Sequence, residues 1–225
     1  MTDDPPKTSV DAPESKLTTT KQRWAREGRF LTGRTTRPEA ERLPPGQHLV
    51  KDWPVLDLGV QPTVARDRWQ LDFFGAIEQP VVWDWAAFQA QTQSRETSDI
   101  HCVTSWSRYD NAWEGVSTAD ALAAVTPNAD ARFVVLHSYD GYTTNLPLDD
   151  FAAPDSILAH SWQGAPLTLE HGGPVRLVVP HLYFWKSAKW IQRIEFLTED
   201  RPSFWETRGY HNRGDPWAEQ RYSSD

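Results

Sequence analysis

The stretch HGGPVRLVVPHLYFWKSAKWI, residues 171–191, begins with two adjacent glycines and ends in a basic cluster. Glycine lets the backbone approach a ligand closely because it has no side chain. The cluster contains Arg176, Lys186 and Lys189. Arginine binds phosphate through its planar fork and lysine binds it as a point charge, so this stretch predicts a phosphate site. The alternative is a surface loop whose basic side chains are simply solvated.

Composition limits the classes of protein to which the chain can belong. The chain has 225 residues, 39% of them hydrophobic, which is enough to bury the core of one domain with tails. A formal charge of −8 argues against binding to nucleic acid or to an anionic membrane, since both need a basic surface. There is no run of about 18 apolar residues to span a bilayer, and the start MTDDPPKTSV lacks the pattern of a secretory signal. We therefore expect a cytoplasmic protein.

Three segments are expected along the chain. Residues 1–52 carry many prolines without apolar periodicity, which predicts an extended or disordered tail. Residues 53–198 form the domain, and residues 199–225 are an extended arm packed on its surface.

Short strands and short helices are predicted within the domain. Strands are expected at WQLDFFGAI (69–77), DIHCVTSW (99–106), ARFVVLHS (131–138), PVRLVVP (174–180) and WIQRIEFLT (190–198). Helices are expected at WDWAAFQAQ (83–91) and at ALAAV (121–125), where Ser117 and Asp120 resemble a capping box. DGYTTN (140–145) predicts a turn, and residues 149–162 a mixed helical or irregular link. Without regular βαβ alternation, the fold class is α+β.

Cys102 is the only cysteine, so it cannot form an internal disulfide. Its value lies in packing, in nucleophilic chemistry or in holding a metal. His101 is a poor partner for the thiol because adjacent residues on a strand point to opposite faces. The seven histidines are scattered singly, which argues against a structural zinc site.

Three motifs together resemble one family. HCVTSWS (101–107), DGYTTNLPLDD (140–150), and HGGPVRLVVP (171–180) followed by WKSAKWI (185–191) are similar to the molybdopterin-binding domain of the sulfite oxidase superfamily, particularly its small bacterial members. The resemblance covers roughly residues 53–198. It implies a sulfite-oxidase-type fold and a Mo-molybdopterin cofactor.

The resemblance also implies roles for individual residues. Cys102 would be the sole protein ligand of molybdenum, and the hydroxyl of Tyr142 would face the active site. His171 and Arg176 would contact the pterin or its phosphate. The remaining cofactor contacts would be Ser138 and, around the phosphate end, Ser187, Ala188 and Lys189.

One departure bears on the substrate. Sulfite oxidases proper carry adjacent arginines four and five places after the ligand cysteine, where this chain has Trp106 and Ser107. Arg108 follows one place later, but strand alternation would turn it to a different face. The local pattern is more similar to the periplasmic methionine-sulfoxide reductase branch. We therefore expect an oxidoreductase that transfers an oxygen atom to or from a small sulfur- or heteroatom-containing substrate such as a sulfoxide.

Other functions stay open at this point. They are sulfite oxidation, a molybdopterin-binding protein without turnover, and a plain interaction domain without a cofactor. The chain has no cysteine set for an iron–sulfur cluster, no C-x-x-C-H and no G-x-G-x-x-G, so a separate electron-transfer protein is expected. The dimerisation domain of larger family members would follow residue 200, and only about 25 residues remain there, so we expect a monomer.

Overall fold

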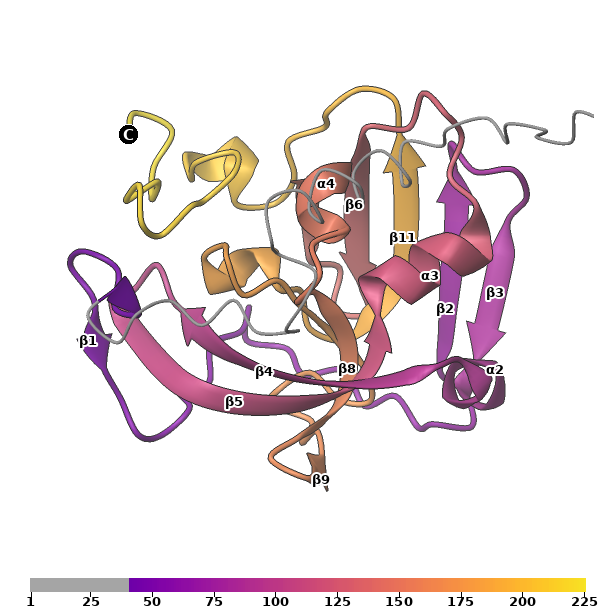
Figure 1. Ribbon diagram of the computed structural model, residues 1–225, viewed down its shortest axis with the longest axis horizontal. Helices are drawn as coiled ribbons and strands as arrows, with labels where there is room; N and C mark the ends of the chain where they lie inside the picture. Colours follow the sequence, from indigo (N-terminus) through magenta and orange to yellow (C-terminus); the bar gives the residue numbers. More distant parts are fainter. Residues whose placement is uncertain (1–40) are drawn as a thin grey trace, which may run out of the picture.

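The computed structural model of the protein describes residues 41–225, which form two β-sheets with short helices at their edges (Figure 1). Residues 1–40, most of the predicted tail, lie outside the described residues. The strands are β1 (His48–Leu49), β2 (Gln70–Gly75), β3 (Val81–Asp84), β4 (Gln93–His101), β5 (Trp106–Ser117), β6 (Phe133–Ser138), β7 (Thr143–Pro147), β8 (Ile157–Trp162), β9 (Ala165–Pro166), β10 (Arg176–Val178) and β11 (Ile191–Leu197). This mixture of short strands and helices agrees with the α+β prediction.

One sheet has the strand order β3-β2-β11-β6-β7. Its central strand β11 runs parallel to β2 and antiparallel to β6. In β2 and β11, apolar residues such as Leu71, Phe73 and Ile194 are fully or almost fully buried, at 0–1% exposure. The predicted alternation therefore sets which face of this sheet meets the core.

The other sheet has the order β1-β5-β8-β10, with β4 added to β5 and β9 to β8. β4 and β5 form a long antiparallel hairpin in which His101 pairs with Ser107. Figure 1 shows this hairpin curving beneath the first sheet. The hairpin turn places Cys102 directly after the last residue of β4.

Three α-helices and two 3₁₀-helices complete the described fold: α2 (Trp85–Ala90), α3 (Thr118–Val125), α4 (Leu148–Phe151), η2 (Phe184–Lys186) and η3 (Glu206–Arg208). The capping-box prediction is confirmed at α3, since the Ser117 side chain accepts a hydrogen bond from the Asp120 amide and donates one to its carboxylate. At α2 the side chain of Asp84 caps the helix, so the helix begins at Trp85 and not at Trp83.

The tryptophans serve both the core and a pocket. Trp69 and Trp113 are buried to 1–2% exposure in the core, and their indole N–H groups donate to the Ile191 carbonyl and the Ser98 hydroxyl. Burying such a side chain with its polar atom satisfied stabilises the fold by about 1.5–3 kcal/mol. Trp53, Trp185 and Trp205 line a cavity.

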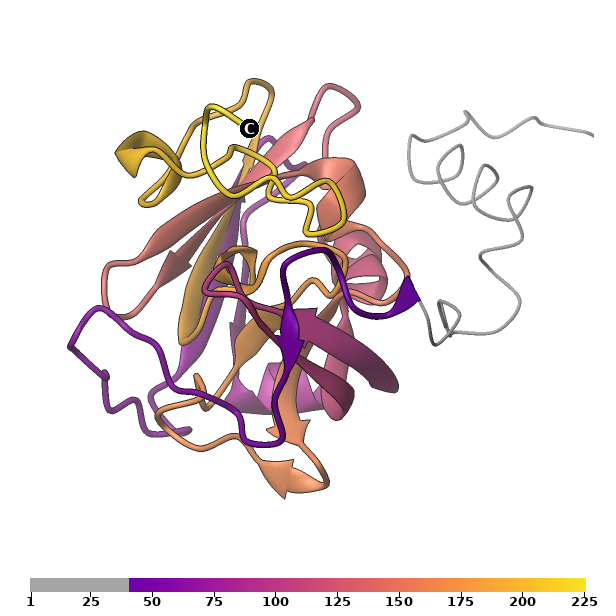
Figure 2. The same ribbon diagram turned by 90° about the vertical axis from the view of Figure 1, so that its left-hand side faces the viewer.

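Residues from both flanks of the predicted domain contact it. In the described part of the N-terminal segment, β1 pairs in parallel with β5. The C-terminal arm, residues 199–225, crosses the domain near η2, as Figure 2 shows. Its Arg213 forms a bidentate ion pair with the buried Asp150 of α4. Hydrogen bonds with His181 and Arg213 lower the Asp150 pKa to about 2, although burial opposes the shift.

Three predictions about local structure are wrong. The single strand expected at residues 99–106 is interrupted, because β4 ends at His101, residues 102–105 form a tight turn, and the strand β5 begins at Trp106. Residues 157–162, expected to be helical or irregular, form β8, which is buried on both faces and therefore shows no alternation. Thr143 and Asn145, predicted in a turn, belong to β7.

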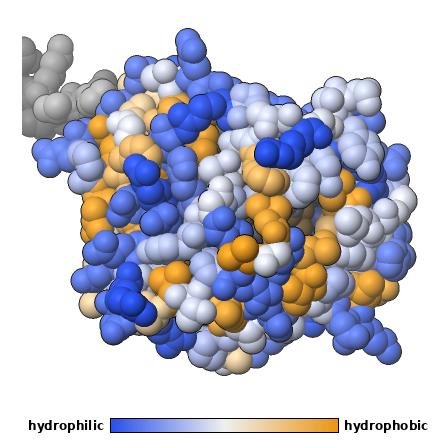
Figure 3. All heavy atoms as spheres, turned by 180° about the vertical axis from the view of Figure 1, so that it is seen from behind, coloured by the Kyte–Doolittle hydropathy of each residue, from blue (hydrophilic) through white to orange (hydrophobic). Residues whose placement is uncertain are grey.

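No helix among residues 41–225 is long and apolar enough to cross a membrane. Seen from behind, the molecule shows apolar residues among polar ones across the exposed surface (Figure 3).

Gly115 is expected to be essential for the pairing of β5 with β8. A Cβ atom there would lie 2.0 Å from the Leu158 carbonyl oxygen, so Gly115→Ala must separate the strands and should lower the free energy of unfolding by about 3 kcal/mol or more. Gly141→Ala is the control, because its Cβ meets no atom within 4 Å and only the φ of +86° opposes it, at a cost of about 1–2 kcal/mol. Urea denaturation of both variants measures the difference, and equal losses would contradict the steric argument.

Candidate functional site

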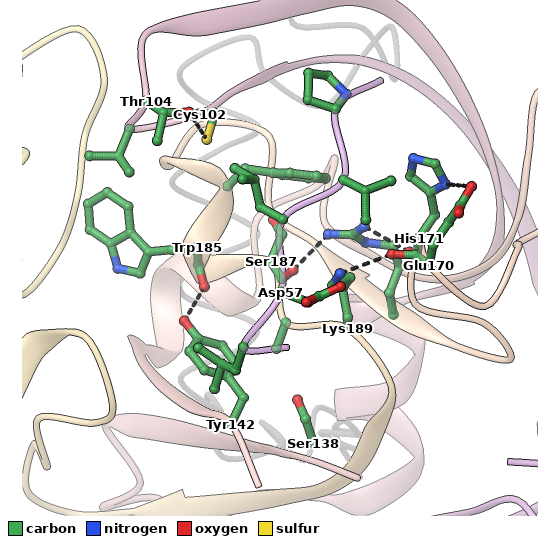
Figure 4. Close-up of a pocket in the computed structure, with 18 of the residues that line it drawn as sticks. Asp57, Cys102, Thr104, Ser138, Tyr142, Glu170, His171, Trp185, Ser187 and Lys189 are labelled. Carbon is green, nitrogen blue, oxygen red and sulfur yellow. Dashed lines mark hydrogen bonds and ion pairs between the residues drawn. The ribbon is translucent and has the colours of Figure 1, made fainter. Parts of the chain in front are cut away.

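A cavity of about 260 Å³ brings together the residues singled out in the sequence. Its walls come from residues 53–58, the β4–β5 turn, the end of β6, the segments 170–176 and 184–190, and the C-terminal arm. The residues predicted to form the site all line it: Cys102, Ser138, Tyr142, His171, Arg176, Ser187, Ala188 and Lys189. Figure 4 shows Cys102 on one side of this pocket and His171 and Lys189 on the other.

Cys102 sits in the tight turn between β4 and β5. Its amide donates to the Trp106 carbonyl at 2.8 Å, and Ser105 closes the turn with a left-handed φ of 74°. The thiol is 6% exposed and lies 3.1 Å from the Thr104 hydroxyl. Burial raises the pKa of the thiol, while the hydrogen bond from Thr104 opposes the shift. The turn therefore presents a shielded sulfur to the cavity.

His101 points away from the thiol, as strand alternation predicted. Its Nδ1 lies 2.8 Å from the Ser107 hydroxyl, and its ring packs edge-on against Trp217. The geometry thus offers no Cys–His nucleophile pair at these two positions. Within residues 41–225, no group of three or more His, Cys, Asp or Glu side chains is arranged to hold a metal ion.

Arg176 is the buried cation of the pocket. Its guanidinium, 2% exposed, donates to the carbonyls of His171 at 2.9 Å and Ser187 at 2.8 Å. The face of the guanidinium lies 4.2 Å from the centroid of the Phe184 ring. No carboxylate in the described part of the chain pairs with it, and desolvation lowers its pKa. A buried charge without a counter-ion favours an anionic ligand.

Lys189 adds a second charge beside Arg176. Its ammonium donates to the Glu170 carbonyl at 2.9 Å, and burial with the nearby Arg176 charge lowers its pKa to about 8. The carboxylates of Asp57, Asp140 and Glu170 oppose that shift. This end of the pocket is therefore charged, with the cations innermost.

Lys186 does not join them, contrary to the sequence prediction. It is 0% exposed, does not line the cavity, and pairs with Glu206 at 2.5 Å. The reason is the short helix η2, which turns consecutive side chains in different directions and sends Lys186 toward β7.

The remaining predicted residues line the cavity in different ways. The Ser138 hydroxyl is buried and has no hydrogen-bond partner within the described residues. The Ser187 hydroxyl instead accepts from the Val179 amide, and the Ala188 carbonyl accepts from the Leu177 amide. His171 lies between the Thr168 hydroxyl and the Trp53 carbonyl, its ring centroid 3.9 Å from that of Trp53.

The two glycines before Arg176 serve the protein's own packing. A Cβ on Gly172 would lie 2.9 Å from the Cβ of Lys189, and one on Gly173 would lie 2.5 Å from the Leu167 carbonyl oxygen. Close packing within the protein therefore explains these two glycines, in place of the predicted approach of a ligand to the backbone. Gly172 lets the chain approach Lys189 closely and so helps to place that side chain.

Two tyrosines line the pocket, and their hydroxyls differ. The hydroxyl of Tyr142 donates to the Trp185 carbonyl at 2.7 Å, and burial holds its pKa well above the ordinary value. The hydroxyl of Tyr210, in the C-terminal arm, makes no hydrogen bond within residues 41–225. Burial raises the Tyr210 pKa, and the ionisable groups of Tyr222 and Cys102 add to the shift.

Several pocket residues escaped the sequence prediction. They are Trp53, Asp57, Thr104, Asp140, Glu170, Trp185, Trp205 and Tyr210. Trp205 and Tyr210 lie in an aperiodic segment, and their ring stacking, with centroids 4.9 Å apart, exists only in the folded protein. The density of aromatic residues in FWETRGY, residues 204–210, is the one signal that pointed to them.

Trp106, Ser107 and Arg108 stand at or next to the positions where sulfite oxidases proper carry two adjacent arginines. Trp106 lines the pocket, while Ser107 is fully buried outside it, against His101. The Arg108 guanidinium donates to Asn111 and to the Lys51 carbonyl and lies over the Trp162 ring. It does not line the cavity. Around Cys102 the walls are therefore aromatic, apolar or hydroxyl-bearing.

The chain is similar to a family model and to several known proteins. Residues 58–205 match the model of the oxidoreductase molybdopterin binding domain. The uncharacterized oxidoreductase YuiH of Bacillus subtilis is 46% identical over 188 residues, covering 83% of this chain and 95% of that protein. The protein-methionine-sulfoxide reductase catalytic subunit MsrP of Burkholderia mallei is 28% identical over 161 residues, which cover 64% of this chain and 48% of that protein.

Among solved structures, the sulfane dehydrogenase SoxCD from Paracoccus pantotrophus has a similar fold, with a TM-score of 0.59 at 17% identity. The match covers 70% of this chain and 46% of that one. The chain thus spans about half the length of MsrP and of the SoxCD chain.

The affinity of the pocket for a phosphate-bearing ligand should fall above pH 8. Lys189 has a pKa of about 8, so it loses its charge as the pH rises through that value. Above that pH, binding of the anion requires Lys189 to take up a proton, which weakens the affinity. The loss should approach tenfold per pH unit, at about 1.4 kcal/mol each. Lys189→Arg should remove the dependence because arginine stays charged. Molybdenum retained after gel filtration at pH 7 and pH 9 measures it, and parallel curves for both proteins would contradict the role of Lys189.

Proposed function

The chain belongs to the family of oxidoreductase molybdopterin-binding domains, the sulfite oxidase family, and on that premise we propose that it is a molybdenum-dependent reductase of small neutral sulfoxides. Membership, together with the fold similarity to SoxCD, confirms the sulfite-oxidase-type fold. It also confirms that the chain is an oxidoreductase of this family. The cofactor's metal, the substrate and the roles of single residues are the proposal.

The residues of the pocket fit a molybdopterin. The Arg176 guanidinium is buried without a carboxylate partner in the described chain, which suits the phosphate of the cofactor. The Ser138 hydroxyl is a buried polar atom with no partner there, so it is available to a polar group of the pterin. Cys102 would supply a soft thiolate, the ligand type that suits the metal.

With the cofactor bound, molybdenum supplies the two-electron chemistry that removes the oxygen. In balance, a sulfoxide, two electrons and two protons give a thioether and water, so the S–O bond breaks and sulfur is reduced. The electrons come from a separate protein donor, since the sequence has no cysteine set or haem motif to carry them. The protein's own residues bind the substrate and deliver protons.

The observation that carries the substrate class is the distribution of charge in the pocket. Lys189 and His171 lie on the side away from Cys102 (Figure 4), and the Arg176 guanidinium donates to the His171 carbonyl there. The uncharged lining residues of the other side are Val103, Thr104, Trp106, Trp185, Trp205 and Tyr210. The Arg221 guanidinium does not line the cavity, but it donates to the Val103 carbonyl and its charge opposes the rise in the Cys102 pKa that burial causes. Sulfite would lose its hydration there with no cation in the lining to pair with it, at a cost of several kcal/mol. A neutral sulfoxide presents only a dipole and needs one hydrogen-bond donor.

Tyr210 is the donor that the geometry favours. Its hydroxyl has no partner among residues 41–225, whereas the hydroxyl of Tyr142 is already donated to a backbone carbonyl. Tyr210 would donate to the sulfoxide oxygen and help to protonate it as the S–O bond breaks. Tyr142 would instead hold the Trp185 backbone in place.

Substrate preference tests the proposal directly. Molybdenum-loaded protein should reduce dimethyl sulfoxide from a reduced dye with a higher kcat/KM than that for oxidising sulfite with an oxidised dye, by about 100-fold or more if desolvation costs about 3 kcal/mol. Cys102→Ser should abolish turnover because a hydroxyl replaces the soft ligand poorly. A preference for sulfite that disappears in Arg108→Ala would overturn the neutral-substrate assignment.

Replacing each tyrosine with phenylalanine distinguishes the role of the Tyr210 hydroxyl from that of the Tyr142 hydroxyl. Tyr210→Phe should lower kcat for sulfoxide by about 10²-fold or more, the usual contribution of a positioned acid, with little change in stability. Tyr142→Phe should chiefly lower the free energy of unfolding, by about 1 kcal/mol for one lost hydrogen bond. Steady-state kinetics and urea unfolding measure both variants. The reverse pattern would return the catalytic role to Tyr142.

A further inference from the structure

The uncharged side of the pocket is built largely by the C-terminal arm. Trp185 of η2 and the arm residues Trp205 and Tyr210 form what we call the aromatic wall. Trp205 and Tyr210 stack with ring centroids 4.9 Å apart, and Trp185 meets Tyr210 edge-on at 5.1 Å. These rings come from two segments, so some interaction must fix one segment against the other.

Glu206 provides that interaction. It lies between Trp205 and Tyr210 in the chain, and its side chain is 0% exposed. One carboxylate oxygen, Oε1, accepts the indole N–H of Trp185 at 3.0 Å and the hydroxyl of Thr144 at 3.1 Å. It also accepts the ammonium of Lys186 at 2.5 Å. Glu206 does not line the pocket, so its effect on the cavity passes through the residues it holds.

Lys186 connects the Glu206 carboxylate to strand β7 of the first sheet. Its ammonium also donates to the Asn145 carbonyl at 2.8 Å and to the Asn145 side chain at 3.2 Å. Burial lowers the pKa of Lys186, while the Glu206 charge opposes the shift. A buried ion pair adds little net stability compared with apolar packing, and its best-supported use is to select one arrangement among several.

We propose that Glu206 is a positioning residue that holds the aromatic wall in a single arrangement over Cys102 and so restricts the site to small sulfoxides. The restriction to small sulfoxides rests on the proposed function, whereas the positioning of the wall does not. With the carboxylate in place, the Trp185 indole is hydrogen-bonded and Tyr210 packs against its edge. Without it, the Trp185 side chain has no hydrogen bond to the arm, which stays joined to the η2 region by ring packing and by the bond from the Tyr183 amide to the Gly214 carbonyl, and the wall should open to larger groups.

Thiol labelling measures the wall without any cofactor. Cys102 is the only cysteine, so an uncharged thiol reagent reports its accessibility in the cofactor-free full chain. Glu206→Gln should raise the labelling rate by about tenfold, since losing a charged hydrogen bond raises the population of open states. Trp185→Phe keeps an aromatic ring but loses the indole N–H and the bulk of the second ring, so it should raise the rate in the same direction even if Glu206→Gln folds poorly.

Glu195→Gln is the matched control. That carboxylate accepts from Arg201 and His137 on the first sheet and does not line the pocket. Its labelling rate should equal that of the wild type. If Glu206→Gln and Trp185→Phe also label at the wild-type rate, the positioning role is overturned.

Substrate size gives the second measurement. In molybdenum-loaded protein, both wall variants should raise kcat/KM for methyl phenyl sulfoxide relative to dimethyl sulfoxide, mainly through KM. An unchanged ratio beside faster labelling would overturn the claim that the wall sets substrate size. A wild type that reduces neither sulfoxide would refute the proposed function, while the labelling result would still decide whether Glu206 positions the wall.

Discussion

The buried guanidinium of Arg176 is the constraint around which the pocket is arranged. Its hydrogen bonds to the carbonyls of His171 and Ser187 join two segments that are otherwise separated by β10. A charge taken out of water needs such partners, because leaving it unpaired would cost several kcal/mol. The carbonyls satisfy the donors but not the charge, and that imbalance is the reason for proposing an anionic ligand at this end of the cavity.

The charge balance of the pocket follows from this arrangement. Asp57, Asp140 and Glu170 lie around Lys189, so the outer part of this end is acidic while the inner part is basic. The cavity lining next to Cys102 carries rings, hydroxyls and aliphatic groups, and the nearby Arg221 guanidinium, which does not line the cavity, donates to the Val103 carbonyl. This separation is the basis of the proposal that one cavity holds an anionic group at one side and a neutral substrate at the other.

Sequence patterns predicted some elements because their physics is local. The alternation in QLDFFG and IQRIEFL and the cap at Ser117 depend only on neighbouring residues, and β2, β11 and α3 form as expected. β5 carries polar residues such as Asp110, whose charge is satisfied by the distant Arg42, so no local pattern marked it as a strand. Tertiary contacts of this kind cannot be inferred from spacing.

The same distinction applies to the site. The predicted pocket residues all line the cavity, and they could be predicted because their motifs resemble those of a known family. The resemblance did not reach Trp205 and Tyr210, which come from an aperiodic arm, and adjacent charges in the sequence did not show that Lys186 faces Glu206 and not the pocket. Which way a side chain faces is decided by packing, here by the short helix η2.

The turn that holds Cys102 also has consequences for biosynthesis. The Gln47 side chain donates to the Cys102 carbonyl, and the Arg221 guanidinium donates to the Val103 carbonyl, 118 positions earlier in the chain. A ribosome must therefore add the arm before the turn acquires its last support. The fully supported turn around Cys102 is accordingly a late product of folding, complete only after the arm has been translated and has folded back over the domain.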